Sequence, residues 1–242
     1  MIILDSCTVR GIGLSSNAAD VLRAIREVKA ERIAVPWIAI EELAAQKALS
    51  YKERHATAEK GLAELREVSH CDEATLDKSD LDAVRKHWRK KFGELVEVLP
   101  TSEVVMAQAL FREANALPPC KQTGSPNNKK KSGARDAAIW LTAVAYAHDH
   151  PNETVFFVSD NTKDFGDGSS HAFPMKGDIA GLGERFVRLA SLGQLLDRFA
   201  QPAKVDQAQV SNRLANFLPS DAIWSSFSMI ARGSGEDGGT TL

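Results

Sequence analysis

Two acidic residues of this sequence stand where a negative charge is costly to place. Asp136 lies in the opening turn of the largely apolar helical segment GARDAAIW, and Asp160 directly follows the apolar run 154–159. Because acidic side chains are seldom buried without a partner, the pair predicts a positive group between them. Each has a simpler explanation when taken singly: an Asp in a first helical turn complements the helix dipole, and an Asp after a strand is common in turns.

Two further acids fall at comparable positions. Asp5 follows the apolar run 2–4, which is typical of a central strand in a parallel sheet, and open α/β sheets bind ligands at the carboxyl ends of their strands. A capping or turn role explains Asp5 equally well. Glu41 and Glu42 lie early in a helical pattern that we expect to begin at Pro36. Helical periodicity alone does not choose between these two glutamates.

The composition excludes several classes of protein. The chain has 242 residues and a formal net charge of -2, so it is not a polycation and any basic surface must be local. Its three cysteines, Cys7, Cys71 and Cys120, show no CxxC spacing, which argues against a zinc site or a disulfide framework and favours a reducing cytoplasm. No secretory leader and no membrane-spanning apolar run is visible.

Segments with strand character alternate with segments of helical periodicity. The expected strands are 2–4, 32–35, 94–99, 154–159 and 185–189. This alternation predicts an α/β, three-layer sandwich with a central, mostly parallel sheet and helices on both faces. The acids would then gather at one sheet edge, where they cannot all stay ionised without a cation. Ligands that are oxygen atoms only favour Mg²⁺ or Mn²⁺.

Two stretches stand outside this alternation. Residues 51–91 are dense in charge and predict a helical insert of one or two amphipathic helices, broken near 70–75. Its basic run 84–91, VRKHWRKK, is more typical of a solvated helix face than of a binding surface. From residue 200 to 242 we expect a C-terminal extension that is partly helical and has a disordered end. Residues 1–199 would form the main domain.

A third stretch, LPPCKQTGSPNNKKKS at 117–132, leads directly towards Asp136. It has three prolines, a glycine and no acidic residue, so we expect an irregular loop. Its lysines suit contact with phosphate groups, and a plain surface linker is an equally good interpretation.

In their order and spacing, these segments resemble a PIN domain, a family of metal-dependent ribonucleases. The matching motifs, over residues 1–199, are ILDSC, VPWIAIEEL, EVLPTSEVV, LPPCK…KSGARDAAIW and FFVSDNTKDF. The family pattern places its second acid before a leucine, which selects Glu42 over Glu41. It places the third acid at Asp136 and the fourth at Asp160, with Asp164 assisting in some members. The likeness is to longer bacterial PIN proteins, and the 51–91 insert and the tail depart from the compact toxin members.

The resemblance implies an endoribonuclease that hydrolyses RNA phosphodiester bonds with Mg²⁺ or Mn²⁺. One or two ions would activate water and neutralise charge on the phosphate. The implied catalytic acids, which are also metal ligands, are Asp5, Glu42, Asp136 and Asp160, with Asp164 as a further ligand. The implied substrate-binding residues, which would orient a phosphate or position the RNA backbone without reading its sequence, are Ser6, Thr8, Lys129, Lys130, Lys131 and Arg135.

The resemblance also implies partners: RNA, an antitoxin protein if the chain is the toxin of a toxin–antitoxin pair, and a second copy in a homodimer. No membrane partner is expected. An alternative is a non-catalytic module that binds RNA or protein on the same fold. Hydrolysis of small phosphate esters through an aspartyl nucleophile is disfavoured, because such enzymes typically carry a second Asp two residues later, where this chain has Cys7.

Overall fold

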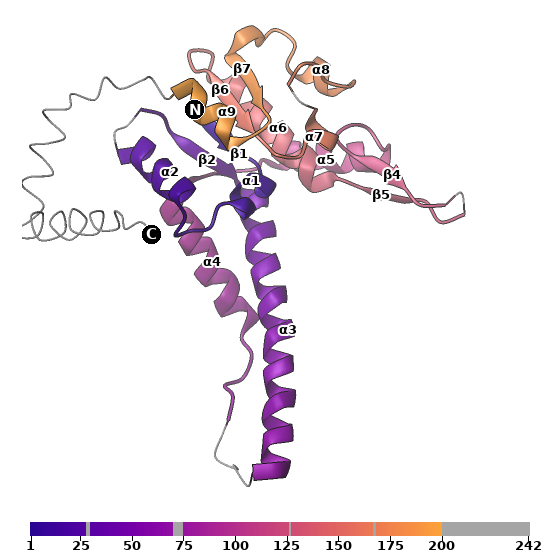
Figure 1. Ribbon diagram of the computed structural model, residues 1–242. Coiled ribbons are helices and arrows are strands. Elements are labelled where there is room, and N and C mark those ends of the chain that lie inside the picture. The colour runs from indigo at the N-terminus through magenta and orange to yellow at the C-terminus, as the bar shows by residue number, and fades with distance from the viewer. Residues whose placement is uncertain (28–29, 70–74, 126, 167, 200–242) are drawn as a thin grey trace, which may run out of the picture. The chain divides into compact units, whose positions relative to one another are not determined.

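The computed structural model of the chain describes residues 1–27, 30–69, 75–125, 127–166 and 168–199. Residues 1–198 form one compact unit around a five-stranded sheet of order β3-β2-β1-β6-β7 (Figure 1). Every pair of neighbouring strands in this sheet is parallel. The strands are β1 (Ile2–Leu4), β2 (Ile33–Pro36), β3 (Glu97–Leu99), β6 (Val155–Val158) and β7 (Phe186–Leu189).

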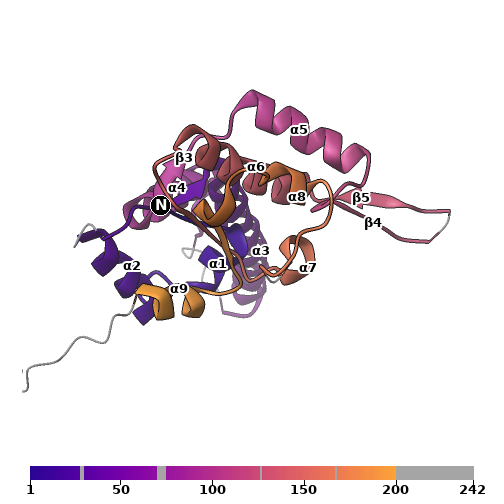
Figure 2. The ribbon, with the colours of Figure 1, turned by 90° about the horizontal axis from the view of Figure 1, so that it is seen from above.

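Helices cover both faces of this sheet and complete the predicted three-layer α/β sandwich. Figure 2 shows α5 and α6 on one side of the sheet and α2 and α9 on the other. The ring of Trp140 in α6 is fully buried and lies 5.6 Å from the ring of Phe157 and 5.3 Å from that of Phe186. These helices and the short α1 are α1 (Ser6–Gly11), α2 (Asn17–Glu27), α5 (Glu103–Ala114), α6 (Ala134–Asp149) and α9 (Leu192–Phe199).

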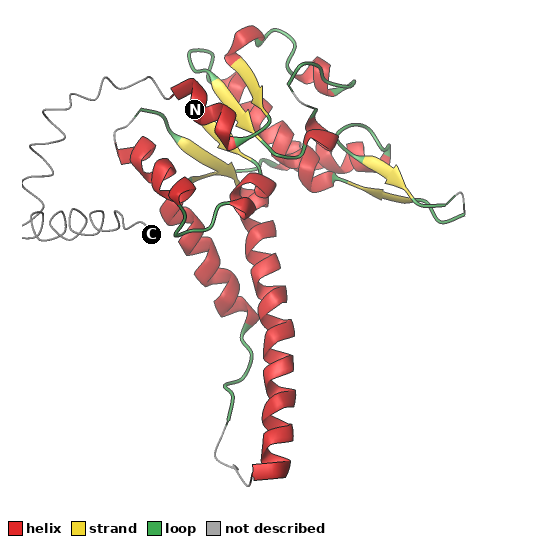
Figure 3. Cartoon of the chain, in the orientation of Figure 1, coloured by secondary structure: helices red, strands yellow, loops and turns green. Residues whose placement is uncertain are grey.

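The helical insert is a pair of helices that projects beyond the sheet, α3 (Trp37–Ser69) and α4 (Leu81–Leu95) (Figure 3). The predicted break between them falls partly on residues 70–74, which lie outside the described residues. A guanidinium–carboxylate pair joins the helices, because Arg89 donates to both Glu41 oxygens at 2.7 Å. Further along, His55 is buried and its Nε2 lies 2.8 Å from the Asp77 carbonyl.

The segment 117–132 differs from the expected loop. It contains an antiparallel hairpin, β4 (Lys121–Thr123) and β5 (Lys130–Ser132), whose turn includes Gly124 at a φ of 104°. Apolar alternation could not have indicated these strands, since neither buries a side chain. The hairpin brings the lysine run onto a defined element beside α5 and α6.

Other differences concern element ends. Pro36 was expected to open a helix, but it ends β2 opposite Leu99, and α3 begins at Trp37. A proline is tolerated at a strand end, where its missing N–H removes no interior ladder bond. The helix α1 was not predicted, and the short α8 (Met175–Asp178) lies between β6 and β7. The short α7 (Thr162–Phe165) follows β6, and η1 (Gly183–Arg185) precedes β7.

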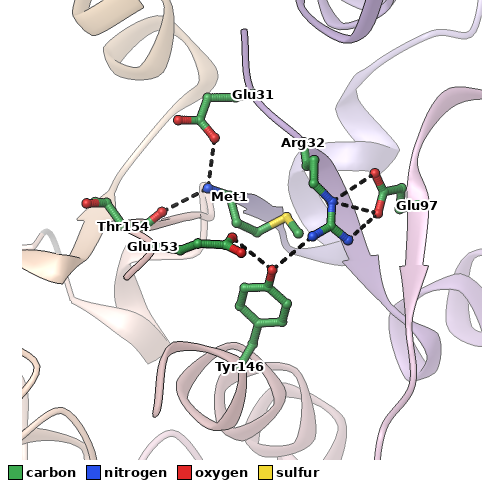
Figure 4. Close-up of polar contacts among 7 residues, drawn as sticks. All are labelled: Met1, Glu31, Arg32, Glu97, Tyr146, Glu153 and Thr154. Carbon is green, nitrogen blue, oxygen red and sulfur yellow. Dashed lines mark hydrogen bonds and ion pairs between the residues drawn. The ribbon is translucent and has the colours of Figure 1, made fainter. Parts of the chain in front are cut away.

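At the amino-terminal edge of the sheet, acidic side chains have close polar partners (Figure 4). The Met1 amino group lies 2.8 Å from Glu31 Oε2. Arg32 donates to Glu97 from two nitrogens, the closer at 2.8 Å, and to the Tyr146 hydroxyl at 3.2 Å. Hydrogen bonding from Arg32 lowers the pKa of Glu97. These acids belong to the scaffold.

None of the helices within the described ranges combines the length and apolar character that a membrane span requires. The predicted C-terminal extension at 200–242 lies outside those ranges.

Candidate active site

Asp5 stands at the carboxyl end of β1 and caps α1, and it is only 1% exposed. Its Oδ1 accepts a hydrogen bond from the Ser6 backbone N–H at 2.6 Å. Its Oδ2 accepts from the Cys7 thiol at 2.8 Å and from the Ser159 hydroxyl at 2.7 Å. Both predictions for Asp5, a cap and a buried sheet-edge carboxylate, therefore describe the same side chain.

Ser159 and Cys7 fix the Asp5 carboxylate, and the sequence analysis had assigned neither to the site. Ser159 is fully buried after β6, and its hydroxyl also accepts from the Asn161 N–H at 3.1 Å. Burial, followed by the nearby Asp5 charge, raises the pKa of the Cys7 thiol. Cys7 is therefore a neutral donor at neutral pH, which is the form that Asp5 needs.

Ser6 and Thr8 are buried in α1, 4% and 2% exposed. The Thr8 hydroxyl lies 3.4 Å from the Val158 carbonyl of β6, which ties α1 to the sheet. Their predicted role in orienting a ligand stays a prediction, and the contact made by Thr8 is one within the scaffold.

Glu42 points towards the acidic edge, whereas Glu41 pairs with α4. Glu42 Oε1 accepts from Gln46 Nε2 at 3.1 Å and from Arg10 Nη2 at 3.3 Å. Arg135, the residue before Asp136, lies 3.7 Å from the same oxygen. With Glu41 occupied by Arg89, the structure favours Glu42 as the member of the acidic group.

Asp136 occupies the first turn of α6, where two contacts fix the helix start. Gly133 precedes the helix at a φ of 120°, and a Cβ there would meet the Cα of Cys120 at 2.8 Å. The Ala134 N–H donates to Glu113 Oε2 at 3.0 Å, so a carboxylate from α5 caps α6. A larger residue at Gly133 would displace the turn that carries Asp136.

The environment of Asp136 is strongly unfavourable to its charged form. Burial, then the charges of Asp5, Asp164 and Glu42, raise the pKa of Asp136 to about 6, and Lys121 opposes the shift. Among the described residues, none donates a hydrogen bond to its carboxylate. Four carboxylates, one at the end of β1 and three in the helices α3, α6 and α7, thus share one electrostatic field.

Asp164, in α7, is held by a residue that the sequence analysis had not assigned to the site. Lys121 of β4 donates to both Asp164 oxygens, at 2.8 and 2.9 Å, and Asn161 Nδ2 donates at 2.9 Å. The hairpin therefore places the ammonium group of Lys121 beside the acidic residues. No sequence signal connects Lys121 with Asp164, which lies 43 residues away.

Asp160 lies at the carboxyl end of β6, as expected, but it is exposed. Burial and the charge of Asp5 raise the pKa of Asp160, and Arg188 of β7 opposes this shift. Asp136 is not among the groups that act on Asp160. Asp160 therefore flanks Asp5, while Asp164 adjoins Asp136.

The lysine run lies along the hairpin. Lys129, Lys130 and Lys131 are exposed, and Lys130 and Lys131 belong to β5. Lys131 donates to the Ala114 carbonyl at the end of α5. Because Arg135 is exposed too and lies beside Glu42, positive charge follows the chain from the hairpin to the acids.

The side chains at this edge fit a divalent cation in their chemistry. Hard ions such as Mg²⁺ and Mn²⁺ prefer carboxylate oxygens, and the raised pKa of Asp136 reflects burial first and then nearby negative charge, which a cation would relieve. As the described side chains stand, no three acidic, histidine or cysteine groups are close enough together to hold an ion. Binding would therefore draw the carboxylates inward.

Comparison with known proteins agrees with this arrangement. The sequence model of the PIN domain matches residues 2–165, which include all five predicted acids. No curated protein and no solved structure matches the chain. The match spans more than half of the chain and the parallel sheet has the expected architecture, so this chain belongs to the PIN domain family, whose members are generally nucleases that use divalent metal ions.

Proposed function

We propose that this protein is a metal-dependent endoribonuclease that hydrolyses phosphodiester bonds of single-stranded RNA. The observation that carries the proposal is the raised pKa of Asp136, about 6, in a group that also contains Asp5, Asp164 and Glu42. A scaffold gains nothing from gathering like charges, whereas a metal site needs them. The family supports nuclease chemistry in general.

Five carboxylates would serve the metal in different ways. Asp5 is fixed by three donors and would be the rigid ligand. Asp136 has no competing donor and would move most easily towards an ion. Asp164 would exchange Lys121 for the metal, and Glu42 would bind directly or through water. Asp160, beside Asp5 and exposed, completes the predicted set: Asp5, Glu42, Asp136, Asp160 and Asp164.

A bound Mg²⁺ or Mn²⁺ would supply charge neutralisation at the phosphate and an activated water. The residues of the chain supply the positioning. Ser159 and Cys7 orient Asp5, because both donate to its Oδ2. Lys121, once released from Asp164, would be free to contact a phosphate oxygen. Its ammonium group would donate a hydrogen bond there.

The lysine run of the hairpin would bind the RNA backbone. Lys129 and Lys130 are exposed on the hairpin, whose second strand ends at Ser132, four residues before Asp136. Contacts of this kind position a strand without reading its sequence, and they weaken as salt rises. The chain has a small negative net charge, so this local basic element is where RNA would be drawn towards the acids.

The proposal is tested by incubating the purified protein with pooled cellular RNA, with chelator or with Mn²⁺, and mapping the new ends. Cleavage at internal sites that needs the metal supports it. Activity that survives exhaustive chelation, in a preparation cleared of contaminating nucleases, contradicts it. Binding of RNA without cleavage under any metal would favour the non-catalytic module instead.

The toxin role, the antitoxin partner and the homodimer stay predictions of the family resemblance, and the cytoplasmic location stays a prediction from the cysteine pattern. Induced expression in a bacterial host provides a test of the toxin role. Growth arrest that is relieved by the product of an adjacent gene supports it. Normal growth at an expression level that cleaves RNA in the purified form contradicts it.

A further inference from the structure

A cavity of about 380 Å³ lies between the loop that follows α1 and the α3–α4 helix pair. Its apolar wall includes Val9, Leu14, Leu43, Trp88 and Phe92. The ring of Trp88 lies 5.6 Å from that of Phe92 in a tilted arrangement. This volume and this lining are typical of sites that accept a small planar ligand.

The polar lining of the cavity is cationic. Arg10 and Lys47 line it together with hydroxyl and amide groups, and none of the described residues that line it is Asp or Glu. The Lys47 Nζ lies 4.6 Å from the centroid of the Trp88 ring, a cation–π contact. A ligand that combines an aromatic ring with negative charge would match both parts of this lining.

The cavity adjoins the acidic site through shared residues. Arg10 and Gln46 line the cavity and also donate to the Glu42 carboxylate, at 3.3 and 3.1 Å. Gln46 is one helical turn along α3 from Glu42, a rise of about 6 Å. A group bound in the cavity is therefore a close neighbour of a group bound at Glu42.

A second hollow of about 410 Å³ lies further along the helix pair and shares Lys47 and Trp88 with the first. Its lining adds Tyr51, His87 and Lys78, with one acid, Asp80, which caps α4. Aromatic rings alternating with cations along a groove are the pattern by which proteins bind single-stranded nucleic acid. The basic run of α4 thus contributes an aromatic side chain to a site.

We propose that the cavity at Trp88 binds an unstacked nucleobase of single-stranded RNA, next to the phosphate held at the acidic edge. This inference rests on the proposed function and adds a base-binding subsite to it. The base would stack on the Trp88 indole in place of the Lys47 ammonium. Lys47, once displaced, would pair with the adjoining phosphate, and Arg10 would meet the phosphate between the base and Glu42.

The test uses a ribo-oligonucleotide that contains a mapped cleavage site, with a single abasic nucleotide moved through each position. For the wild-type chain, kcat/KM should fall about 10-fold when the base at one fixed distance from the cut is missing, since base stacking has an effect of this order. For Trp88→Leu, that position should respond no more than its neighbours do. Lys47→Met, which removes the ammonium group but keeps an aliphatic side chain of similar length, should weaken RNA binding.

Two matched variants control for general effects. Phe111→Leu changes an aromatic residue that is 62% exposed on α5, and Lys52→Ala removes an exposed lysine five residues after Lys47 in the same helix. Both should behave as wild type. Circular dichroism tests whether Trp88→Leu is folded. If this variant is unfolded, Lys47→Met provides an independent test.

The outcomes separate this inference from the proposed function. Cleavage by the wild type with an abasic profile that Trp88→Leu leaves unchanged overturns the base-binding site and keeps the ribonuclease. No cleavage by the wild type overturns the ribonuclease. In that case, RNA affinity measured in chelator tests the base-binding site by itself. Equal affinity of Lys47→Met and Lys52→Ala for RNA would overturn this site as well.

Discussion

The two edges of the same parallel sheet treat acidic side chains in opposite ways. At the amino edge, Arg32 bonds to Glu97 and the Met1 amino group bonds to Glu31. At the carboxyl edge, the charges of Asp5, Asp164 and Glu42 act together on a half-buried Asp136. The first edge pairs its acids with cations, whereas at the second edge Asp136 has no ion-pair partner among the described residues, although Lys121 and Arg10 pair with its neighbours Asp164 and Glu42.

The two edges therefore contribute to the free energy of unfolding with opposite dependence on pH. The lowered pKa of Glu97 means that its contribution to folding is present above its unfolded pKa and is lost as pH falls. The raised pKa of Asp136 has the opposite sign: in metal-free protein, its contribution is present below about pH 4 and is lost as pH rises to about 6. The amino edge contributes to the stability of the fold, and the carboxyl edge holds the charge that we propose a cation neutralises.

The largest expected effect is on cleavage. Asp136→Asn should reduce metal-dependent RNA cleavage by about 100-fold or more, because loss of a metal-directed carboxylate removes several kcal/mol of transition-state stabilisation. Glu97→Gln is the matched control at the other edge and should cleave at the wild-type rate. Initial rates at saturating Mn²⁺ measure both. Equal losses in the two variants would remove the functional distinction between the edges.

Metal binding should stabilise the folded protein through the carboxyl edge alone. At a concentration 100 times the dissociation constant, Mn²⁺ adds about 2.7 kcal/mol by mass action. Wild type and Glu97→Gln should show this gain in urea unfolding, and Asp136→Asn should gain much less. A gain that is the same in all three proteins would place the ion elsewhere.

In chelator, the Asp136→Asn variant should be more stable than wild type at pH 7.5, by about 1–3 kcal/mol, because the substitution removes a repelled charge. The difference should shrink as pH falls through about 6 and vanish near pH 4, where the wild-type carboxyl is protonated. Unfolding free energies at several pH values measure this. A variant that is less stable than wild type at pH 7.5 would indicate a structural Asp136.

The smallest effect belongs to the amino edge. Glu97→Gln should lower stability at pH 7 by less than about 1 kcal/mol, since Arg32 and Glu97 are both partly exposed to solvent. The loss should disappear in acid, as Glu97 of the wild type becomes protonated. The same urea experiments provide the measurement. A stabilised Glu97→Gln variant would mean that the amino edge is also short of positive charge.

The sequence predicted the position of a residue correctly where that position depends on its neighbours along the chain. A carboxylate directly after a buried strand must lie at the sheet edge, so Asp5 and Asp160 could be placed from the apolar runs before them. Asp136 followed from its position at the start of an apolar helix. The sheet itself followed from the alternation of strands and helices, and only strand ends shifted, as at Pro36.

The sequence contained no indication of features that depend on a contact between distant segments. Periodicity could not separate Glu41 from Glu42, because the difference is the pairing of Glu41 with Arg89 on another helix. The hairpin that carries Lys121 to Asp164 has exposed strands and leaves no apolar pattern. The positions of the acids at the sheet edge were therefore predicted, whereas the groups that bond to them were missed, and the role of these acids as a site stays a prediction.

The pKa of the Asp136 side chain tests the central claim most directly. It can be measured by carbon-detected NMR on aspartate-labelled protein, with Asp136→Asn identifying the resonance. In chelator, the carboxyl should titrate at about 6, and in saturating Mg²⁺ it should stay ionised through that range. A carboxyl that titrates near 4 in both conditions would contradict a metal site at the carboxyl edge of this sheet.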